Sequence, residues 1–286
     1  MRRIVAAALA SVVACWTPLS AQSGGFPDRP LTAGTVAAGD AGTSPNPLDA
    51  VFLNPARTVG ASQLMASYLA HEETGLRGYA LMAAFKAGIP VALSIWKYEA
   101  ANLFDEELLA ADPTLASLGV FTTGLDIAAA VPIRSLVLAL GVSAAFQHTL
   151  AVDDQRFGTR VGVAVDEPIG LLGLSWTGHA GRSPLSDFDA GTARATTIIR
   201  PLRGPILVQL GLEVAWSPGD DRLAFINSVA AGPGPLKAIA GWRWNDRQAT
   251  LGITLQVERL ALTVGRELGS GTVIGGLTAL TFSMRW

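Results

Sequence analysis

Apolar residues take every second position along most of the chain that follows residue 60. The stretch 250–258 shows this most clearly, because Leu251, Ile253, Leu255 and Val257 alternate with small or polar residues. The same alternation recurs in the segments 160–165, 208–216 and 259–265. Successive side chains of a strand point to opposite faces, so each segment predicts a β-strand with one apolar face and one small or polar face.

Turn signals between these segments predict about fourteen strands, with about twelve as the lower limit. The expected strands are 62–71, 76–86, 88–98, 117–131, 134–149, 156–166, 168–179, 193–202, 204–216, 221–230, 236–244, 248–256, 259–267 and 271–286.

The junctions between the expected strands are of two kinds. Short junctions are expected to be periplasmic turns, as at Gly88-Ile89-Pro90, Asn245-Asp246-Arg247 and Glu258-Arg259. The stretches 99–116 and 181–192 are longer and more polar, as external loops are. Residues 103–111 predict a short helix in the first of these loops, which the pair Asp112-Pro113 ends.

A transmembrane antiparallel up-and-down β-barrel explains the alternation best, although a soluble, secreted β-sandwich with a structural or adhesive role would share it. The apolar face is uniformly large, and the charged residues fall almost wholly on the small face or at segment ends, as expected with lipid outside and a crowded lumen inside. Tryptophans near the expected strand ends favour two interfacial girdles; they are Trp96, Trp176, Trp216, Trp242, Trp244 and Trp286.

The composition agrees with a membrane protein. Half of the residues (50%) are hydrophobic, only 15% are charged, and the formal net charge is −2. Soluble domains carry about 25% charged residues, and disordered chains combine low hydrophobicity with high net charge. The near-neutral charge also excludes the basic footprint of a nucleic-acid binder.

The first 21 residues predict a signal peptide, with Arg2 and Arg3 before an apolar core and a small-residue exit at Ala21. Export together with the predicted barrel implies a location in the outer membrane of a Gram-negative-type envelope. Cys15 follows Val12-Val13-Ala14, a spacing similar to that of a bacterial lipobox, so lipidation at this cysteine is the alternative to cleavage after Ala21.

A barrel of about fourteen strands is wide enough to need a plug, because about eight strands fill themselves and about sixteen leave a channel. Residues 22–60 are the expected N-terminal hatch or plug segment, and residues 61–286 the expected barrel. The lumen-facing polar candidates carry both signs, which predicts pairing across the lumen and anchoring of the hatch. They are Asp126, Gln147, Arg160, Gln209, Glu213, Lys237, Arg243, Gln256, Glu258, Arg259, Glu267 and Arg285.

The last strand ends in a motif for assembly. Phe282, Met284 and Trp286 lie on one face, and a terminal aromatic residue there resembles the signal by which the barrel-assembly machinery recognises outer-membrane barrels.

Short motifs precede the first expected strand: small residues around Asp40, the pair Asp49-Ala50, and Asn54-Pro55-Ala56. Together they resemble the FadL-type long-chain fatty-acid transporters, and equally the PorV/PorQ branch of that superfamily, which is found with the type IX secretion system. The resemblance implies that Asn54, Pro55 and Ala56 stand where the hatch enters the barrel. The chain is much shorter than typical fatty-acid transporters, which implies reduced external loops.

The resemblance implies passive binding and transport of a small hydrophobic compound, through a ligand pocket and a hatch kink or a lateral gap. Outer-membrane lipid is an expected partner. The alternative is a secretion-associated barrel that binds a secreted partner protein at its external loops. No catalytic, metal or cofactor site is expected, because His71, His148 and His179 are scattered and no nucleophile elbow or phosphate-binding loop is present. We therefore expect a protein that is not an enzyme.

Overall fold

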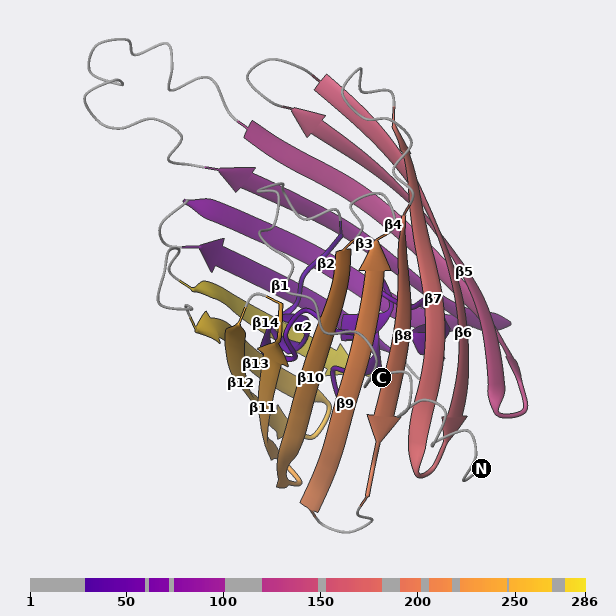
Figure 1. Cartoon of the computed structure of the whole chain (residues 1–286), viewed down its shortest axis with the longest axis vertical. Coiled ribbons are helices and arrows are strands. Elements are labelled where there is room, and N and C mark those ends of the chain that lie inside the picture. The colour runs from indigo at the N-terminus through magenta and orange to yellow at the C-terminus, as the bar shows by residue number, and fades with distance from the viewer. Residues whose placement is uncertain are drawn as a thin grey trace.

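The computed structural model describes residues 29–59, 62–71, 75–100, 120–148, 153–181, 191–201, 206–217, 222–245, 247–268 and 276–286. Its strands β1 to β14 are antiparallel and close into one barrel, in which each strand pairs with its neighbours in the sequence and β1 pairs with β14 (Figure 1). The predicted up-and-down barrel is therefore confirmed, and the sandwich alternative is wrong.

The strands are β1 (Gln63–His71), β2 (Leu76–Ala87), β3 (Ile89–Ala100), β4 (Val120–Ile133), β5 (Leu136–His148), β6 (Asp153–Glu167), β7 (Gly170–Gly181), β8 (Thr192–Ile199), β9 (Ile206–Ser217), β10 (Arg222–Pro233), β11 (Leu236–Arg243), β12 (Gln248–Val257), β13 (Leu260–Leu268) and β14 (Leu277–Arg285).

The alternation sorts the side chains between the two faces of the wall. In β12, Leu251, Ile253, Leu255 and Val257 point outward and are about half exposed, whereas Thr250 on the other face is buried. The outward positions of the other strands are likewise mostly large and apolar. Such a surface suits lipid and not water, because exposed apolar patches of this extent are rare on soluble monomers.

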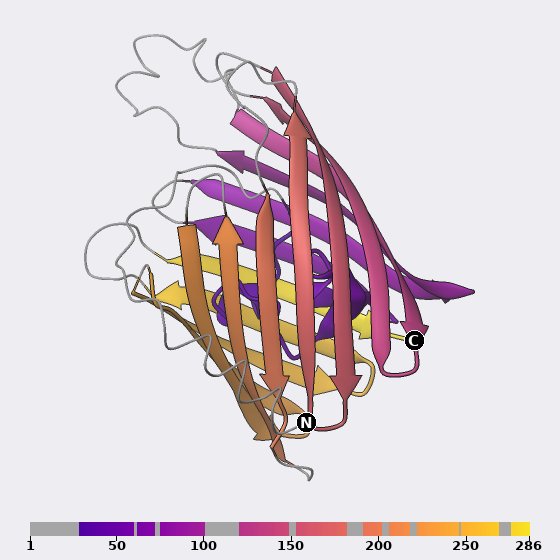
Figure 2. The same ribbon diagram turned by 45° about the vertical axis from the view of Figure 1, so that its right-hand side comes forward.

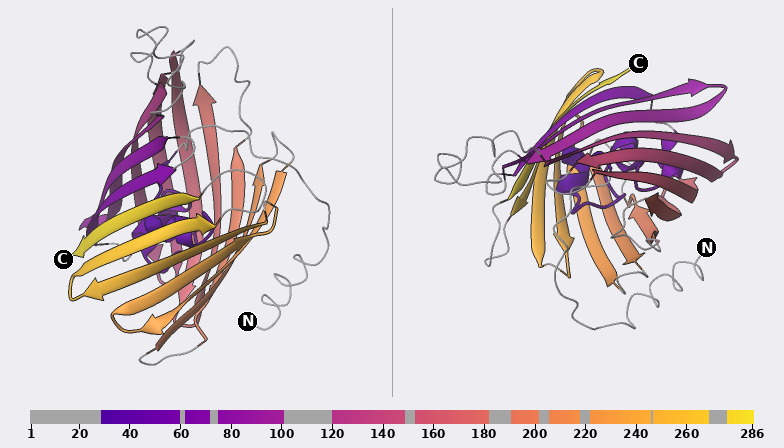
Figure 3. Two further views of the ribbon diagram at one scale, coloured as in Figure 1. Left: turned by 90° about the vertical axis from the view of Figure 1, so that its left-hand side faces the viewer. Right: turned by 90° about the horizontal axis from the view of Figure 1, so that it is seen from above.

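Residues 29–59, here called the lumen segment, lie inside the barrel (Figure 3). The segment forms α2 (Ala33–Ala37), α3 (Pro47–Ala50) and the 3₁₀-helix η1 (Pro55–Thr58). The first helix packs against β11 to β14, and η1 packs against β3 to β6. Among the described residues, no helix has the length and apolar character needed to cross a membrane.

Local sequence explains where these short helices start. Thr32 caps α2 in a capping box with Thr35. Asn46 and Asn54 cap α3 and η1, and each is followed by a proline at the first helical position. Proline suits that position because its missing N–H would have no partner there, and its fixed φ is already helical.

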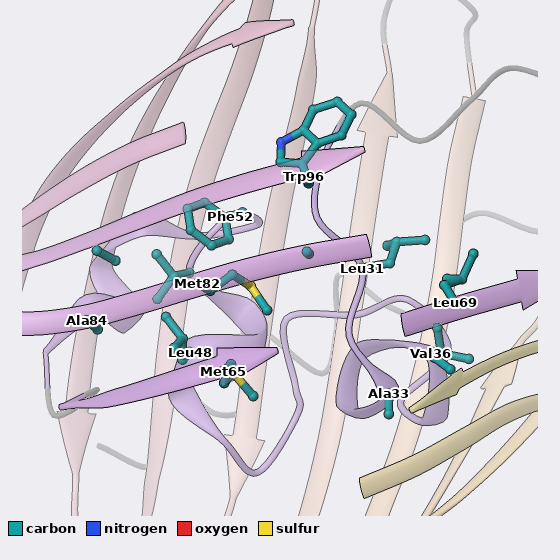
Figure 4. Packing of buried hydrophobic residues seen from close by; sticks show 14 of the residues in the cluster. Leu31, Ala33, Val36, Leu48, Phe52, Met65, Leu69, Met82, Ala84 and Trp96 are labelled. Atoms are coloured by element: carbon teal, nitrogen blue, oxygen red, sulfur yellow. The ribbon is translucent and has the colours of Figure 1, made fainter. Parts of the chain in front are cut away.

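The largest apolar cluster of the described residues joins the lumen segment to one side of the wall (Figure 4). Leu31, Leu48 and Phe52 of the segment pack with Met65 and Met82 of β1 and β2. The small residues that alternate with the lipid-facing ones thus leave room for the segment inside.

Successive strands run in opposite directions, so the junctions after odd-numbered strands lie at one end of the barrel, here called the loop end, and the other junctions lie at the turn end (Figure 2). At the loop end, strands are joined by residues 101–119 and 182–191, among others. At the turn end, Gly88 and the pair Glu258-Arg259 join strands, and the chain ends in Trp286.

The three junctions expected to be periplasmic turns do not share one end. The junction at Asn245-Asp246-Arg247 follows β11, and every junction after an odd-numbered strand lies at the loop end. It therefore lies at the opposite end from Gly88 and Glu258-Arg259, because a short junction shows its length and not its side. The expected signal peptide, Cys15 and the helix at 103–111 lie outside the described residues.

Candidate functional site: the filled lumen

The first helix of the lumen segment is tied to three strands. The Ala33 amide donates to the Thr281 hydroxyl of β14 at 2.8 Å. The Thr250 hydroxyl of β12 donates to the Ala37 carbonyl at 2.8 Å, and Arg243 Nε of β11 donates to the Gly39 carbonyl at 3.3 Å. These bonds satisfy backbone groups at both ends of α2 that the short helix leaves unpaired.

Two glycines of the wall let α2 approach this closely. Gly252 and Gly265 face each other on β12 and β13. A Cβ on Gly265 would lie 2.2 Å from the Ala33 carbonyl oxygen, and one on Gly252 would lie 2.4 Å from the Ala37 Cβ. Any side chain at these two positions would collide with the helix, so the wall here is shaped to hold the segment.

A buried carboxylate on β9 holds the next part of the segment. Glu213 Oε2 accepts the Gly42 amide at 2.7 Å and the Thr196 hydroxyl at 3.0 Å. Its Oε1 accepts Arg194 Nη1 at 2.6 Å. The carboxylate, which has no exposed surface, is thus neutralised by the arginine of β8.

One residue further along, at Thr43, the segment bonds to β9 and β10. Gln209 Nε2 donates to the Thr43 carbonyl at 2.7 Å, and the Thr43 hydroxyl lies 2.7 Å from the Ser228 hydroxyl. The lumen segment is therefore held by the wall from β9 round to β14.

The Asn54-Pro55-Ala56 turn is held against the opposite part of the wall. Asn54 Oδ1 accepts the Ala56 amide at 3.0 Å and so caps η1. A Cβ on Gly162 of β6 would lie 2.3 Å from Asn54 Oδ1, and one on Gly173 of β7 would lie 2.8 Å from its Nδ2. The Ser175 hydroxyl of β7 donates to the Leu53 carbonyl at 2.9 Å.

Asp126 and Arg160 form a buried ion pair on the wall beside this turn. Arg160 Nη1 lies 2.5 Å from Asp126 Oδ1, and neither side chain exceeds 2% exposure. Asp126 Oδ2 also accepts Trp96 Nε1 at 2.6 Å and the Ser94 hydroxyl at 2.9 Å.

Trp96 therefore does not belong to the expected interfacial girdle. Its ring points into the lumen and covers Gly124, where a Cβ would lie 2.2 Å from the ring. It shares the inward face of β3 with Ser94 and Tyr98, and the indole N–H finds its partner on Asp126. The other five tryptophans of the expected girdles are outward and exposed.

The pKa values of two acidic groups in the lumen segment, Asp49 and Asp40, are shifted in opposite directions. Burial raises the pKa of Asp49 to about 6, against the lowering effect of the hydrogen bond from the Ser44 hydroxyl at 2.6 Å. Burial also acts on Asp40, but the positive charges of Arg29, Arg243 and Arg194 outweigh it and lower the pKa of Asp40. Arg29 pairs directly with Asp40.

The cation near Asp49 is also buried. Burial lowers the pKa of Arg57 to about 10, so the guanidinium stays charged near neutrality. Arg57 Nη2 donates to the Ser44 carbonyl at 3.0 Å. Ser44 thus bonds to both Asp49 and Arg57, and it links α3 to η1.

The sequence-derived polar candidates fall into separate groups. Gln209, Glu213 and Arg243 touch the lumen segment, and Arg243 also lies 3.4 Å from Glu267. Asp126 and Arg160 pair on the wall, and Gln147 is half-buried near the loop end. The remaining candidates gather at the turn end of β11 to β14; they are Lys237, Gln256, Glu258, Arg259 and Arg285.

Ion pairs between the described lumen-facing charges run along the wall. Three lumen-facing ion pairs of the described wall link adjacent or next-but-one strands: Asp126 with Arg160, Arg194 with Glu213, and Arg243 with Glu267. The lumen segment occupies the middle of the barrel, so charges on opposite sides face it instead of each other.

Several contact residues escaped the sequence analysis. Arg194 and Thr196 are two residues apart and therefore share one face of β8, so the alternation of the sequence could have identified them as inward residues. Tyr98 accepts the Leu31 amide at 2.7 Å and donates to the Arg29 carbonyl at 2.9 Å, but nothing local in the sequence indicates this role. Within the described residues, no group of His, Cys, Asp and Glu side chains is placed to hold a metal ion.

Phe282, Met284 and Trp286 all point outward at the turn end of β14 and are exposed. Their arrangement places the terminal aromatic residue on the lipid-facing side of the strand that closes the barrel.

Comparisons with known proteins give structural neighbours but no family. No family model and no curated protein matches the chain. A TodX deltaS2S3 mutant, a monoaromatic hydrocarbon channel, aligns with a TM-score of 0.51 at 10% identity, over 90% of this chain and 99% of that one. The Acinetobacter baumannii outer membrane protein Omp33 aligns with a TM-score of 0.46 at 13% identity, over 78% and 96%.

A porin mutant from Rh. blastica aligns with a TM-score of 0.42 at 9% identity, over 78% of this chain and 97% of the porin. These neighbours are outer-membrane β-barrels, of the porin and channel type. At such low identity, the likeness to the hydrocarbon channel shows a shared fold.

Proposed function

We propose that this chain is an outer-membrane β-barrel through which a small hydrophobic compound passes passively, with the lumen segment as its hatch. The observation that carries the proposal is the seating of residues 29–59 inside a closed barrel, bonded to strands on several sides of the wall. A filled lumen opposes free diffusion of ions and hydrophilic solutes, which distinguishes this barrel from an open porin.

The class of compound follows from what the barrel offers. The outward face is apolar, so a hydrophobic molecule reaches the wall readily from the membrane. The neighbour with a TM-score of 0.51 is a monoaromatic hydrocarbon channel, which supports a small apolar compound as the cargo. FadL-type membership remains part of this proposal and rests on the motifs before β1, above all Asn54-Pro55-Ala56.

The proposal includes the location of the chain and its assembly. Export by the signal peptide, with Cys15 lipidation as the alternative, would deliver the chain to the outer membrane. The outward Phe282, Met284 and Trp286 would serve the assembly machinery as the recognition motif. The turn end would then face the periplasm and the loop end the exterior, as is usual for such barrels.

Two measurements test this proposal. Cells with and without the chain are compared for uptake of radiolabelled toluene and of a labelled long-chain fatty acid. The purified protein is also placed in planar bilayers, where the filled lumen predicts a conductance far below that of an open porin. Faster uptake of one compound together with low ionic conductance supports a hatch-bearing carrier.

Unchanged uptake of both compounds would refute the carrier function. If a secreted protein then co-purified with the barrel, and if its binding were lost when the external stretches 101–119 or 182–190 were deleted, the partner-binding barrel would replace it. A heat-modifiable shift on a gel checks in either case that the barrel is folded.

A further inference from the structure

Basic side chains at the turn end of the barrel differ from those in the middle of the wall, where Arg160 and Arg194 each pair with a buried carboxylate. On neighbouring strands at the turn end, four basic residues form no ion pair with any described residue. These four are here called the basic rim; they are Lys86, Lys237, Arg259 and Arg285.

The basic rim follows the edge of the barrel over six consecutive strands, from β11 through β14 and β1 to β2. Lys237 is the second residue of β11, and Arg259 lies in the turn between β12 and β13. Arg285 ends β14, and its amide donates to the Arg259 carbonyl at 2.8 Å. Lys86 is the next-to-last residue of β2, two strands beyond Arg285.

Three of the four side chains face the opening of the lumen and not the lipid. Alternation places Lys86 on the same face as the buried Met82 and Ala84. In the same way, Lys237 shares the inward face of β11 with Ile239, and Arg285 shares that of β14 with Ser283. Lys86 and Arg285 are exposed, and Lys237 is half-buried. These charges are therefore accessible to a partner that approaches the open end of the barrel.

The basic rim keeps a positive charge after the anionic groups beside it are counted. Among the described residues of these strands and their turns, the anionic groups at the turn end are Glu258 and the terminal carboxylate of Trp286. The chain as a whole has a formal net charge of −2, so the positive charge is a local feature.

The hydrogen bonds of the basic rim leave its charge uncompensated. Lys237 Nζ lies 3.5 Å from Gln256 Oε1, and Arg285 Nε lies 3.5 Å from Gln63 Oε1. Both partners are neutral amides, and hydrogen bonds of this length are weak. A carboxylate would bind these cations more strongly, because a hydrogen bond between charged groups is about twice as strong as a neutral one.

The spacing of the cations indicates the size of the partner. Five strand-to-strand steps separate β11 from β2, which at about 4.8 Å a step is about 24 Å along the edge. A single carboxylate or phosphate is too small to contact cations that far apart. An extended polypeptide advances about 3.4 Å per residue, so about seven residues with several carboxylates would span the basic rim.

We propose that the basic rim docks an extended acidic segment of a partner protein. The inward direction of Lys86, Lys237 and Arg285 favours a protein over the head groups of the surrounding lipid. The partner is periplasmic if the turn end faces the periplasm, so its location rests on the proposed membrane orientation. The docking itself requires neither the hatch nor transport.

Peptide binding to the purified barrel tests the proposal. The barrel is placed in nanodiscs of phosphatidylcholine, and fluorescence anisotropy follows labelled octaglutamate or octaglutamine. We expect saturable binding of octaglutamate and none of octaglutamine, and free glutamate should not displace the peptide at the same carboxylate concentration. Raising the salt from about 0.1 M to about 1 M shortens the Debye length from about 10 Å to about 3 Å, so binding should weaken on the order of tenfold.

A double variant with a matched control locates the binding surface. Lys237→Gln with Arg285→Gln should weaken octaglutamate on the order of tenfold, because two of the four cations are removed. Arg77→Gln with Lys97→Gln changes the net charge equally at exposed positions near the loop end, and it should bind octaglutamate as the parent does. A heat-modifiable shift on a gel shows that both barrels are folded.

Equal binding of octaglutamate and octaglutamine, or equal losses in the two double variants, would overturn the docking surface. If the parent bound no peptide but retained phosphatidylglycerol that Lys237→Gln with Arg285→Gln lost, the cations would be assigned to lipid and the proposal overturned. Labelling of Ser135→Cys, in the turn after β4, by an impermeant maleimide on intact cells would overturn the periplasmic location. Peptide binding involves no cargo, so its failure and failure of the transport proposal are distinguishable.

Discussion

Replacing Gly265 by alanine would place one methyl group against the backbone of α2. The added Cβ would lie 2.2 Å from the Ala33 carbonyl oxygen and 3.0 Å from its carbon. Both are backbone atoms, so no side-chain rotation relieves the collision. Since a non-bonded carbon and oxygen repel each other at distances below about 3.4 Å, α2 must move away from β13 by about 1 Å.

The magnitude follows from the hydrogen bonds that such a shift strains. Three of them tie α2 and the residues after it to the wall, through Thr281, Thr250 and Arg243. Each contributes about 1 kcal/mol net, so losing all three costs about 3 kcal/mol. That corresponds to about a hundredfold larger population of barrels in which the segment is unseated, because about 1.4 kcal/mol is a factor of ten.

Conductance in planar bilayers measures the unseated population directly. The Gly265→Ala barrel is expected to conduct ions up to about a hundredfold more than the parent, while its heat-modifiable migration shows that the wall is intact. Gly88→Asn is the control, because a Cβ at Gly88 meets nothing within 4 Å and asparagine accepts its φ of +78°.

Equal conductance of the parent, Gly265→Ala and Gly88→Asn would refute the reasoning. It would mean that the lumen segment tolerates the methyl group without moving, or that ions pass by another route. A higher conductance of Gly88→Asn would point instead to a general loosening of the barrel.

Three further predictions concern the stability of the filled barrel, read as the free energy of unfolding by urea in liposomes. Because burial raises the pKa of Asp49 from 3.8 to about 6, the folded chain binds a proton that the unfolded chain has released between about pH 4 and pH 6. Stability should therefore fall by up to about 3 kcal/mol as the pH rises through that window, and Asp49→Asn should remove this slope. Asp126→Ala should lower the free energy of unfolding by about 3–5 kcal/mol, because it leaves Arg160 buried without its counter-charge. The double variant Asp126→Leu with Arg160→Met should recover most of that loss, since it removes both charges. The pairing would be refuted if the single and the double variant lost the same stability. Asn54→Ala should cost about 1 kcal/mol by uncapping η1, and Asn54→Ser should retain most of that stability.

The wall could be predicted from the sequence because each strand has lipid on one side. That requirement leaves a period of two that needs no alignment to see, and β12, expected at 248–256, runs from Gln248 to Val257. The same alternation placed Gln209 and Glu213 on the inward face. It also placed Trp96 inward beside Ser94 and Tyr98, and the preference of tryptophan for interfaces led the prediction astray there.

The contacts inside the barrel could not be predicted from the sequence. Alternation tells which face a residue occupies, but not its partner two strands away. Arg160 reaches Asp126 across β5, where Gly141 supplies no side chain to separate them. Three strands must take their register before that pair exists, and nothing local in the sequence records it.

The place of the lumen segment gives barrel assembly a direction. The residues that fill the barrel precede every strand of its wall, and the strand that completes the wall is the last. The bond from the Ala33 amide to the Thr281 hydroxyl spans 248 residues and can form only once β14 has arrived. The β1–β14 pairing that closes the barrel and the bond that fixes the lumen segment to β14 therefore form together. A chain stopped before β14 would have an open barrel and would also lack the bond from Ala33 to Thr281.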